Sequence, residues 1–306
     1  MSTTNELVVR KVGSFEELDF LPELLEKEGW QLGRNEVRCV FNADPSGFFV
    51  GTVGEKKISH ISVVKHDHFA FVSYFLVEES YRGKGYGRQT WQSGLASVNE
   101  GCNVGLGSLK NMVGLYEKKG FERAWIDYEF VISTSNTTKV LTGSAQLPPV
   151  TIIKPIVEVQ FDALFAYDTA VFGAPRRKFL EALTTLPESI GFAAVGEEGG
   201  LVGYTMCEKM LKEDKGVRIT PLFANNEQIA RGLLQAVSEA LYSQNPPHID
   251  VQITLVVPDI NPVAMNLVEN VLSGRSDFQV VHMFTKGIPA SMNLAKTFAI
   301  TSLDLG

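Results

Sequence analysis

The sequence has few cysteines, no cluster of basic residues and no long apolar segment. Its three cysteines lie far apart and none belongs to a CxxC pair, so we expect reduced thiols and a cytoplasmic protein. No stretch of about 18 uninterrupted apolar residues occurs, and the first ten residues lack a signal-peptide core, so we expect no membrane association. A net charge of -7 at pH 7, without any basic run, argues against nucleic acid as a partner.

Metal ligands are also scarce. His66 and His68 flank Asp67, but no further ligand cluster supports a metal site. We interpret these residues as a solvated turn between two strands and expect no metal cofactor.

The length of 306 residues predicts two domains, since single domains usually have ~100–200 residues. With 44% hydrophobic and 21% charged residues, the composition is that of a globular protein. Residues 134–150 lack periodicity and are rich in Ser, Thr, Gly and Pro, which is typical of a linker. We therefore expect a first domain over 1–135, a linker over 136–150 and a second domain over 151–306.

The first half predicts an α+β fold, with a mixed and mostly antiparallel sheet flanked by helices. Residues 69–77 are apolar on both faces, as in the central strand of a covered sheet. Pro22 predicts a break or kink in the first helix. The expected elements are helices over 14–30 and 35–42, strands over 48–53, 58–65 and 69–77, a helix after a glycine-rich stretch, a strand over 103–109, a helix over 111–119 and a strand over 121–133.

The second half repeats this order loosely, which predicts a second copy of the same architecture. At its strand-to-helix junction, residues 224–230 contain no glycine and include Glu227, so we expect no nucleotide to bind there. The expected elements are helices over 161–172 and 176–186, a hairpin around 196–200, a strand over 217–223, a helix over 226–242, a strand over 248–257, a helix over 261–272 and a strand over 278–284.

A glycine-rich loop follows the apolar strand that ends at Val77. It reads Arg82-Gly83-Lys84-Gly85-Tyr86-Gly87-Arg88, and an amphipathic helix starts on its last glycine. Glycines let the backbone turn and approach a ligand, so that several N–H groups point into one hollow with the positive end of a helix dipole behind them. Three cationic side chains add charge, and such a nest fits a pyrophosphate.

Three other interpretations of this loop compete. A Walker A loop needs glycine where Glu78 stands, and Ser or Thr where Gly85 follows Lys84. A dinucleotide fingerprint needs Gly-x-Gly-x-x-Gly at the first strand of a βαβ unit, whereas this loop has Gly-x-Gly-x-Gly after an antiparallel meander. The third is a glycine-rich turn without a ligand, which the loop alone does not exclude.

The loop and its surroundings resemble the GCN5-related N-acetyltransferase (GNAT) superfamily. Arg82-x-x-Gly85-x-Gly87 is similar to its acetyl-CoA loop, and residues 115–121, Leu-Tyr-Glu-Lys-Lys-Gly-Phe, are similar to its late helix and following strand. The resemblance covers residues 8–133. Further matches resemble a two-domain subfamily with a divergent C-terminal acetyltransferase-like domain, which implies tandem GNAT folds. These matches are Glu28-Gly29-Trp30, Asn111, Asp168-x-x-Val171-Phe172-Gly173-x-x-Arg176 and Gly203-Tyr204.

The resemblance implies that acetyl-CoA is a co-substrate bound by the first domain. Backbone groups of Phe75, Leu76 and Val77 would pair with the pantetheine arm like an added strand. A bulge there would aim an N–H at the thioester oxygen, and Tyr116 would protonate the leaving thiolate. The other implied cofactor contacts are Arg82, Gly83, Lys84, Gly85, Tyr86, Gly87, Arg88 and Asn111.

The resemblance defines the acceptor side less closely. Trp30 and Glu28 lie in the segment that caps the acceptor site in the superfamily, and Tyr204 is the candidate from the second domain. Many relatives have a glutamate base on the strand before the loop, where this sequence has Ser73 and Tyr74. Attack by an already neutral amine and a base acting through water stay open. The remaining candidates for a general base are Glu28, His60, Asp127 and Glu129.

These features predict an N-acetyltransferase that moves an acetyl group from acetyl-CoA to a primary amine, by direct attack in a ternary complex. The acceptor would be a small molecule or a peptide, held in a cleft between the two domains. The alternative is an acyl-CoA-binding sensor or regulatory protein without turnover, which the missing strand carboxylate favours. We expect a monomer or a homodimer, because the second domain can fill the role of a partner subunit.

Overall fold

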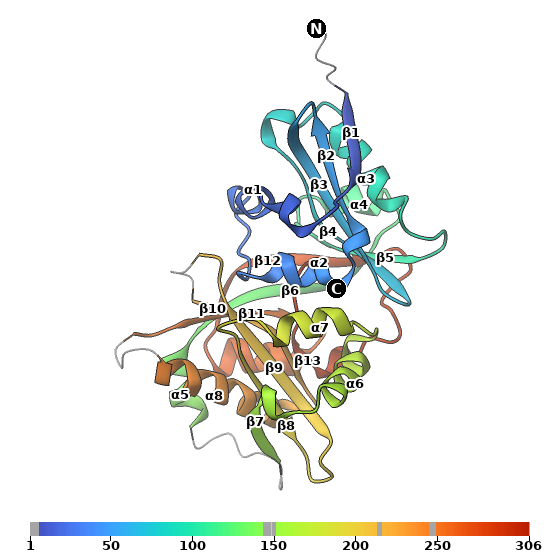
Figure 1. Cartoon of the computed structure of the whole chain (residues 1–306). Coiled ribbons are helices and arrows are strands. Elements are labelled where there is room, and N and C mark those ends of the chain that lie inside the picture. The colour runs from blue at the N-terminus through green and yellow to red at the C-terminus, as the bar shows by residue number, and fades with distance from the viewer. Residues whose placement is uncertain (1–5, 143–147, 149–150, 213–215, 245–248, 306) are drawn as a thin grey trace.

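One mixed sheet connects the two halves of the chain (Figure 1). The computed structural model describes residues 6–142, 148, 151–212, 216–244 and 249–305; we call residues 6–142 the N-terminal half and residues 151–305 the C-terminal half. Within these residues the sheet has 13 strands in the order β1-β2-β3-β4-β5-β12-β6-β11-β10-β9-β8-β7, and β13 pairs with β10. The sequence-based prediction of an α+β fold with a mixed sheet is confirmed.

The N-terminal half begins with β1 to β4, which pair antiparallel in order. Short turns join β2 to β3 and β3 to β4, whereas two α-helices lie between β1 and β2. The chain then crosses through α3, and β5 pairs parallel to β4. The elements are β1 (Leu7–Lys11), α1 (Leu21–Lys27), α2 (Glu36–Ala43), β2 (Phe48–Val53), β3 (Lys56–Lys65), β4 (Phe69–Val77), α3 (Tyr86–Leu95), β5 (Asn103–Ser108), α4 (Val113–Glu117), β6 (Glu122–Ser133) and α5 (Thr134–Leu141).

The C-terminal half repeats this arrangement. Strands β7 to β10 pair antiparallel in order, and β11 returns parallel to β10 through α8. The elements are β7 (Ile152–Pro155), α6 (Phe161–Phe172), α7 (Arg177–Thr184), β8 (Ile190–Val195), β9 (Leu201–Lys209), β10 (Val217–Ala224), α8 (Glu227–Gln244), β11 (Gln252–Pro258), α9 (Pro262–Met265), a π-helical turn (Asn266–Val271), β12 (Arg275–Phe284) and β13 (Thr297–Ala299).

The two halves exchange strands at the centre of the sheet. Strand β12 of the C-terminal half lies between β5 and β6 of the N-terminal half and pairs antiparallel with both. Strand β6 in turn pairs with β11 of the C-terminal half. Each half therefore completes its sheet with a strand that the other half supplies.

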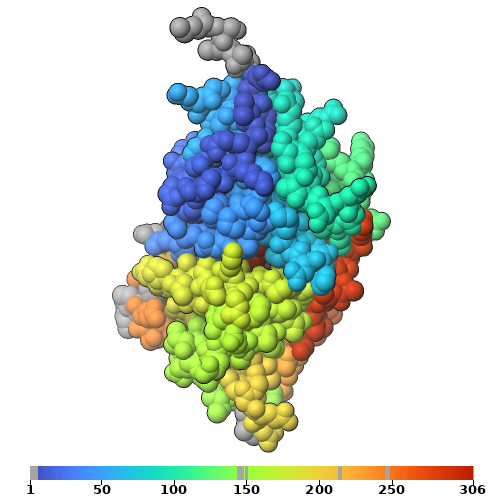
Figure 2. Space-filling view, turned by 45° about the vertical axis from the view of Figure 1, so that its right-hand side comes forward, coloured from blue at the N-terminus to red at the C-terminus, as the bar shows by residue number. Residues whose placement is uncertain are grey.

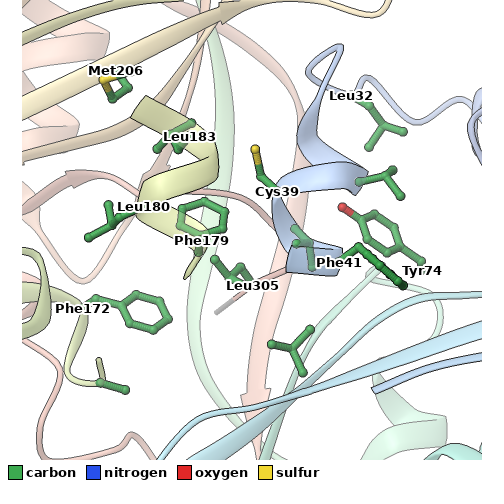
Figure 3. Packing of buried hydrophobic residues seen from close by; sticks show 14 of the residues in the cluster. Leu32, Cys39, Phe41, Tyr74, Phe172, Phe179, Leu180, Leu183, Met206 and Leu305 are labelled. Atoms are coloured by element: carbon green, nitrogen blue, oxygen red, sulfur yellow. The ribbon is translucent and has the colours of Figure 1, made fainter. Parts of the chain in front are cut away.

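The halves also share a hydrophobic core. Helix α2 packs against α7, and Leu305 lies between them (Figure 3). Phe179 on α7 and Cys39 on α2 belong to one buried cluster with residues of both halves. The space-filling view accordingly shows the two halves in contact along their boundary (Figure 2).

Several expected elements differ from the structure. Pro22 does not kink a helix; it lies in the first turn of α1, where its missing N–H leaves no bond unmade, and a separate 3₁₀ turn precedes it at Phe15–Leu18. Residues 134–141 form α5 instead of an irregular linker, with the Ser133 side chain accepting a hydrogen bond from the Asn136 N–H. Residues 143–147 and 149–150 of the expected linker, and His248 of an expected strand, lie outside the described residues.

The cysteines are free thiols, and Cys39 and Cys207 are buried. Across the described ranges, no helix combines the length and the apolarity that crossing a membrane requires.

Candidate active site

The glycine-rich loop has the backbone geometry that its sequence predicts for an anion-binding nest. Gly83 and Gly85 have φ of 74° and 83°, a region that side chains with a Cβ rarely adopt. Gly85 is the N-cap of α3, and the first helical bond there runs from Gln89 N to Gly85 O at 3.3 Å. Because helices leave the N–H groups of their first turn without a partner inside the helix, those of Gly87 and Arg88 can bind an anion.

Side chains around the loop hold it in place. The Arg82 Nε donates to the Val77 carbonyl at 2.8 Å, and its guanidinium also pairs with Glu28 at the end of α1. Lys84 donates to the Ser80 carbonyl at 3.0 Å. Tyr86 is buried against β1 and β3. Arg82 therefore orders the loop and is partly neutralised, while Arg88 stays exposed.

Strand β4 carries a bulge directly before the loop. Pairing with β3 shifts register between His60 and Ser62, opposite Tyr74, which has a φ of 45°. The His60 Nδ1 donates to the Tyr74 carbonyl at 3.0 Å. Burial lowers the pKa of His60 to about 4, so the ring is neutral at pH 7 and fixes the bulge.

Beyond the bulge, β4 and β5 diverge. Their parallel pairing ends at Val72 and Leu106, although β4 continues to Val77. The segment Phe75–Val77 therefore has one edge turned away from β5. The backbone of Phe75, Leu76 and Val77 does not pair with β5, and its pairing with an extended ligand stays a prediction.

A cavity of about 280 Å³ lies between the halves at this divergence. Gly107 and Leu109 line it from the end of β5, and Trp30 lines it from the segment after α1. The Trp30 ring lies 6.2 Å from that of Tyr74, centroid to centroid. Other lining residues are Glu36, Glu129, Arg218, Asp277, Phe278, Val280, Leu303 and Asp304.

Buried charges dominate one wall of the cavity. The Arg218 guanidinium donates to the Glu129 carboxylate at 3.1 Å and to the Gln31 carbonyl at 2.7 Å, and it lies 4.0 Å from Glu36. Burial, followed by the charge of Glu36, raises the pKa of Asp304 well above its usual range. Three buried carboxyl groups thus face a single buried guanidinium.

The predicted acceptor residues take different places. Trp30 lines the cavity, whereas Glu28 is bound to Arg82 beside the glycine loop. Tyr204 is fully buried elsewhere, and its hydroxyl donates to the Asp168 carboxylate at 2.5 Å. Asp168 also receives two hydrogen bonds from Arg176, so the motif that contains them joins core elements and does not line this cavity.

Tyr116 and Asn111 flank the other side of β5. Tyr116 packs against Trp91 and Phe121, with ring centroids 5.6 and 5.9 Å away. Burial raises its pKa, so the phenol keeps its proton at pH 7. Asn111 is exposed just before α4.

The four candidate general bases lie at different places in the structure. The His60 side chain supports the bulge in β4. Asp127 is buried and accepts from His282 Nδ1 at 2.8 Å and from Trp125 Nε1 at 2.9 Å. Glu28 binds Arg82, which leaves Glu129 as the member of this set that lines the cavity.

Arg218, Glu36 and Asp304 are among the cavity residues that the sequence did not predict. Arg218 was detectable, because it is a charged residue in an otherwise apolar buried strand. Glu36 resembles an ordinary acidic residue in the first turn of a helix. Asp304 gave no signal, because it follows β13, a strand of three residues that no periodicity reveals.

The C-terminal half differs from the N-terminal half at the place where its two parallel strands separate. Strands β10 and β11 pair only near their starts, and β13 lies beside the separated part of β10. Ile300 N donates to the Val256 carbonyl of β11 at 2.9 Å. The Asn226 side chain caps α8 by accepting from Ile229 N at 3.0 Å, so the chain itself fills the gap that is open in the N-terminal half.

Metal ligands do not gather in the part of the chain that the structure describes: no group of three or more His, Cys, Asp or Glu side chains could hold an ion there.

Comparisons with known proteins agree with this duplication. A family model described as "Acetyltransferase (GNAT) family" matches residues 13–121, and one described as "Acetyltransferase (GNAT) domain" matches residues 164–299. The chain belongs to the GNAT superfamily. The predicted superfamily and its tandem organisation are confirmed, and GNAT proteins as a family use acetyl-CoA.

Several proteins are similar to nearly the whole of this GNAT chain. The holothin acyltransferase of a Pseudoalteromonas species is 26% identical over 301 residues, which cover 97% of this chain and 94% of the relative. A putative acetyltransferase of Pyrococcus horikoshii superposes with a TM-score of 0.74 at 14% identity, covering 100% of this chain and 98% of that one. A tandem GNAT protein from the clavulanic acid biosynthesis pathway has a TM-score of 0.63 at 14% identity, covering 91% and 98%. These structures support the tandem fold.

Proposed function

We propose that this GNAT protein transfers an acetyl group from acetyl-CoA to a primary amine of a small molecule held in the cavity between the halves. One observation carries the proposal: Trp30, which lines the cavity, packs against Tyr74 in the bulge of β4, and this strand leads directly into the glycine-rich loop. A cofactor entering from the loop and an acceptor entering from the cavity would reach the same point.

The N-terminal half offers a contact for each part of acetyl-CoA. Backbone N–H groups of residues 83–88 would bind the pyrophosphate at the positive end of α3. The free edge of Phe75–Val77 would pair with the pantetheine arm. The acetyl group would then lie beside Tyr74, where an N–H at the bulge could stabilise the developing oxyanion.

The cavity supports an amine as the acceptor. Its carboxyl groups outnumber its one arginine, which favours a cation over an anion. A volume of about 280 Å³ suits a small molecule better than a folded protein segment. The names of two relatives, which refer to holothin and to the clavulanic acid pathway, also support a small molecule.

Direct attack in a ternary complex then needs no covalent enzyme intermediate. The amine nitrogen would attack the thioester carbon, the carbon–sulfur bond would break, and Tyr116 would give its proton to the sulfur. A monomer suffices for this arrangement, because the C-terminal half supplies the second wall of the cavity.

A valine at Gly85 tests the cofactor site. Gly85 has positive φ, and among the described residues no other heavy atom lies within 4 Å of the position that a Cβ would occupy. The substitution therefore acts on the backbone and on the open hollow of the nest. We expect the affinity for acetyl-CoA, measured by calorimetry, to fall by about tenfold or more. Gly54→Val is the matched control, because Gly54 also has positive φ and open surroundings but lies in the β2–β3 turn.

A second experiment distinguishes a transferase from an acyl-CoA sensor. Release of free CoA, followed with a thiol reagent over a panel of cationic, neutral and anionic amines, supports the transferase. Tight binding of acetyl-CoA without CoA release for any amine would favour the sensor instead. If Gly85→Val and the unaltered chain bind acetyl-CoA with equal affinity, the glycine-rich loop is not the cofactor site.

A further inference from the structure

The C-terminal segment, residues 293–305, runs from the C-terminal half into the cavity. Its β13 pairs with β10, and the Thr301 carbonyl accepts from the Thr220 hydroxyl at 2.7 Å. Ser302 then donates to Glu36 of α2, and Leu305 is fully buried between α2 and α7. Residues 301–305 are therefore anchored at both ends, at Thr301 by a hydrogen bond and at Leu305 by packing.

Asp304 is the residue that this anchoring brings to the bulge. It is 4% exposed and lines the cavity. The backbone N–H of Tyr74, in the bulge of β4, lies close enough to the Asp304 carboxyl group to oppose the rise of its pKa. Tyr74 directly precedes Phe75, the first residue of the free β4 edge, so the carboxylate lies next to the point where the thioester is expected.

Asp304 differs from Glu36 and Glu129, the other buried carboxylates of the cavity, in having no close cation. Glu129 is bound by Arg218 at 3.1 Å, and Glu36 lies 4.0 Å from the same guanidinium. Among the described residues, no lysine or arginine nitrogen lies within 4.0 Å of the Asp304 carboxylate, although Arg218 exerts a longer-range attraction. The surrounding titratable and charged groups are Glu36 of α2, Tyr74 of β4, Glu129 of β6, Glu208 of β9, Arg218 of β10 and Asp277 of β12.

Tyr74 packs against Trp30 of the cavity wall but does not line the cavity itself. The Tyr74 hydroxyl is fully buried and has no hydrogen-bond partner among the described residues, and its pKa is raised by burial and by the charges of Asp304 and Glu36. An ammonium group beside these carboxyl groups would compensate their charge. The cavity is thus built for a cation.

We propose that Asp304 is the general base of the transferase and that its substrates are cationic amines, whose ammonium group it binds and deprotonates. This inference rests on the proposed function. The ammonium gives one proton to Asp304, and the neutral nitrogen attacks the thioester carbon as the carbon–sulfur bond breaks. The sulfur takes the Tyr116 proton. The nitrogen loses its second proton to water, Asp304 passes its proton to water and Tyr116 regains one, so one proton is released per turnover.

The carboxylate reaches the reaction from the opposite half of the chain. The resemblance to the superfamily would place a base on β4, where Ser73 and Tyr74 stand. In the structure, the carboxyl group of Asp304 lies near the backbone N–H of Tyr74 on this strand. Because Asp304 must be ionised to accept a proton and its pKa is raised, the rate should increase with pH as Asp304 loses its proton.

The test compares Asp304→Asn, Asp304→Glu and the unaltered full-length chain with an aliphatic diamine and acetyl-CoA. We expect kcat/KM of Asp304→Asn to fall by about 100-fold or more at pH 7, with unchanged affinity for acetyl-CoA. The loss should diminish towards the pH at which the amine itself is neutral, and Asp304→Glu should recover part of the rate. Leu305→Ala controls for packing: it should lower Tm but keep the shape of the pH profile.

The unaltered chain provides a second measurement that does not depend on the variant folding. Two cationic acceptors whose amine pKa values differ by roughly two units should give a rising limb of kcat/KM at the same pH, because that limb belongs to Asp304. If the pH of the rising limb instead shifts with the pKa of the amine, the inference is wrong.

The outcomes also separate this inference from the proposed function. If the unaltered chain acetylates amines and Asp304→Asn keeps its rate and pH profile, Asp304 is not the base but the transferase stands. If anionic amines react faster than cationic ones, the substrate class is wrong. If the unaltered chain acetylates no amine, both proposals fall.

Discussion

Tyr116 combines a protonated phenol with a position fixed by aromatic packing. Its ring contacts Trp91 and Phe121, so Tyr116→Phe preserves the packing and removes only the proton donor. We expect kcat to decrease at least tenfold while the affinity for acetyl-CoA stays nearly the same, since a general acid contributes about 10²–10⁴-fold. Steady-state kinetics with a reactive amine and calorimetry with acetyl-CoA measure the two effects.

Tyr128→Phe is the matched control, because Tyr128 is a partly buried tyrosine of β6 that packs against the core of the C-terminal half. It should leave kcat unchanged. A kcat for Tyr116→Phe within about twofold of the unaltered value would refute the role of the phenol.

For single residues, the sequence predicts the site where its function depends on the conformation of the local backbone. Gly83 and Gly85 adopt positive φ, which favours glycine, and this requirement is visible in neighbouring residues of the sequence. The cavity charges are different, because Glu36, Arg218 and Asp304 come from three distant segments. Each alone is an ordinary residue, and only folding gathers them.

Among the elements, β13 covers an edge of the sheet in the C-terminal half. It lies beside β10 where the equivalent edge of β4 is free. Together with the capped start of α8, this leaves neither a free strand edge nor a nest for a second cofactor. We expect one acetyl-CoA per chain, measured as the stoichiometry of a calorimetric titration.

A crystal structure or titration with two CoA molecules per chain would contradict this prediction. As a control, the Gly85→Val chain should bind acetyl-CoA about tenfold or more weakly, with no remaining site that has the affinity of the unaltered protein. Residual binding with that unaltered affinity would indicate that the C-terminal half carries a site.

The elements differ in how far the sequence could predict them. The bounds of β4 and α6 agree with the expectation, because both have long apolar patterns. Helix α5 was missed, since its Ser- and Thr-rich sequence has weak helix propensity and its position depends on packing against α8. Strand β13 and the insertion of β12 depend on partners far away in the chain, so no local pattern encodes them.

For the whole molecule, strand exchange predicts that the N-terminal half cannot fold alone. A chain that ends after residue 141 lacks β12 and β11, so β5 loses one neighbour and β6 loses both. The shared core around α2 would also be exposed. We expect such a chain to aggregate or to lack a cooperative thermal transition, and to lose acetyl-CoA binding.

Coexpression of residues 1–141 and 151–306 as two separate chains is the control. Because the pairing of β6 with β12 and β11 requires no covalent link, the two pieces should assemble and recover acetyl-CoA binding. A chain of residues 1–141 that unfolds cooperatively and binds acetyl-CoA like the full protein would show that β12 is dispensable.

The exchanged strands also set an order of events during synthesis. Residues 122–133 leave the ribosome long before residues 275–284, which must lie between them and β5. At about 5–20 residues per second, the N-terminal half waits for roughly ten seconds or more with the edges of β5 and β6 unpaired. Unpaired edges attract other strands. The nascent chain therefore passes through an interval in which a chaperone would be most useful, and that interval closes when β12 is translated.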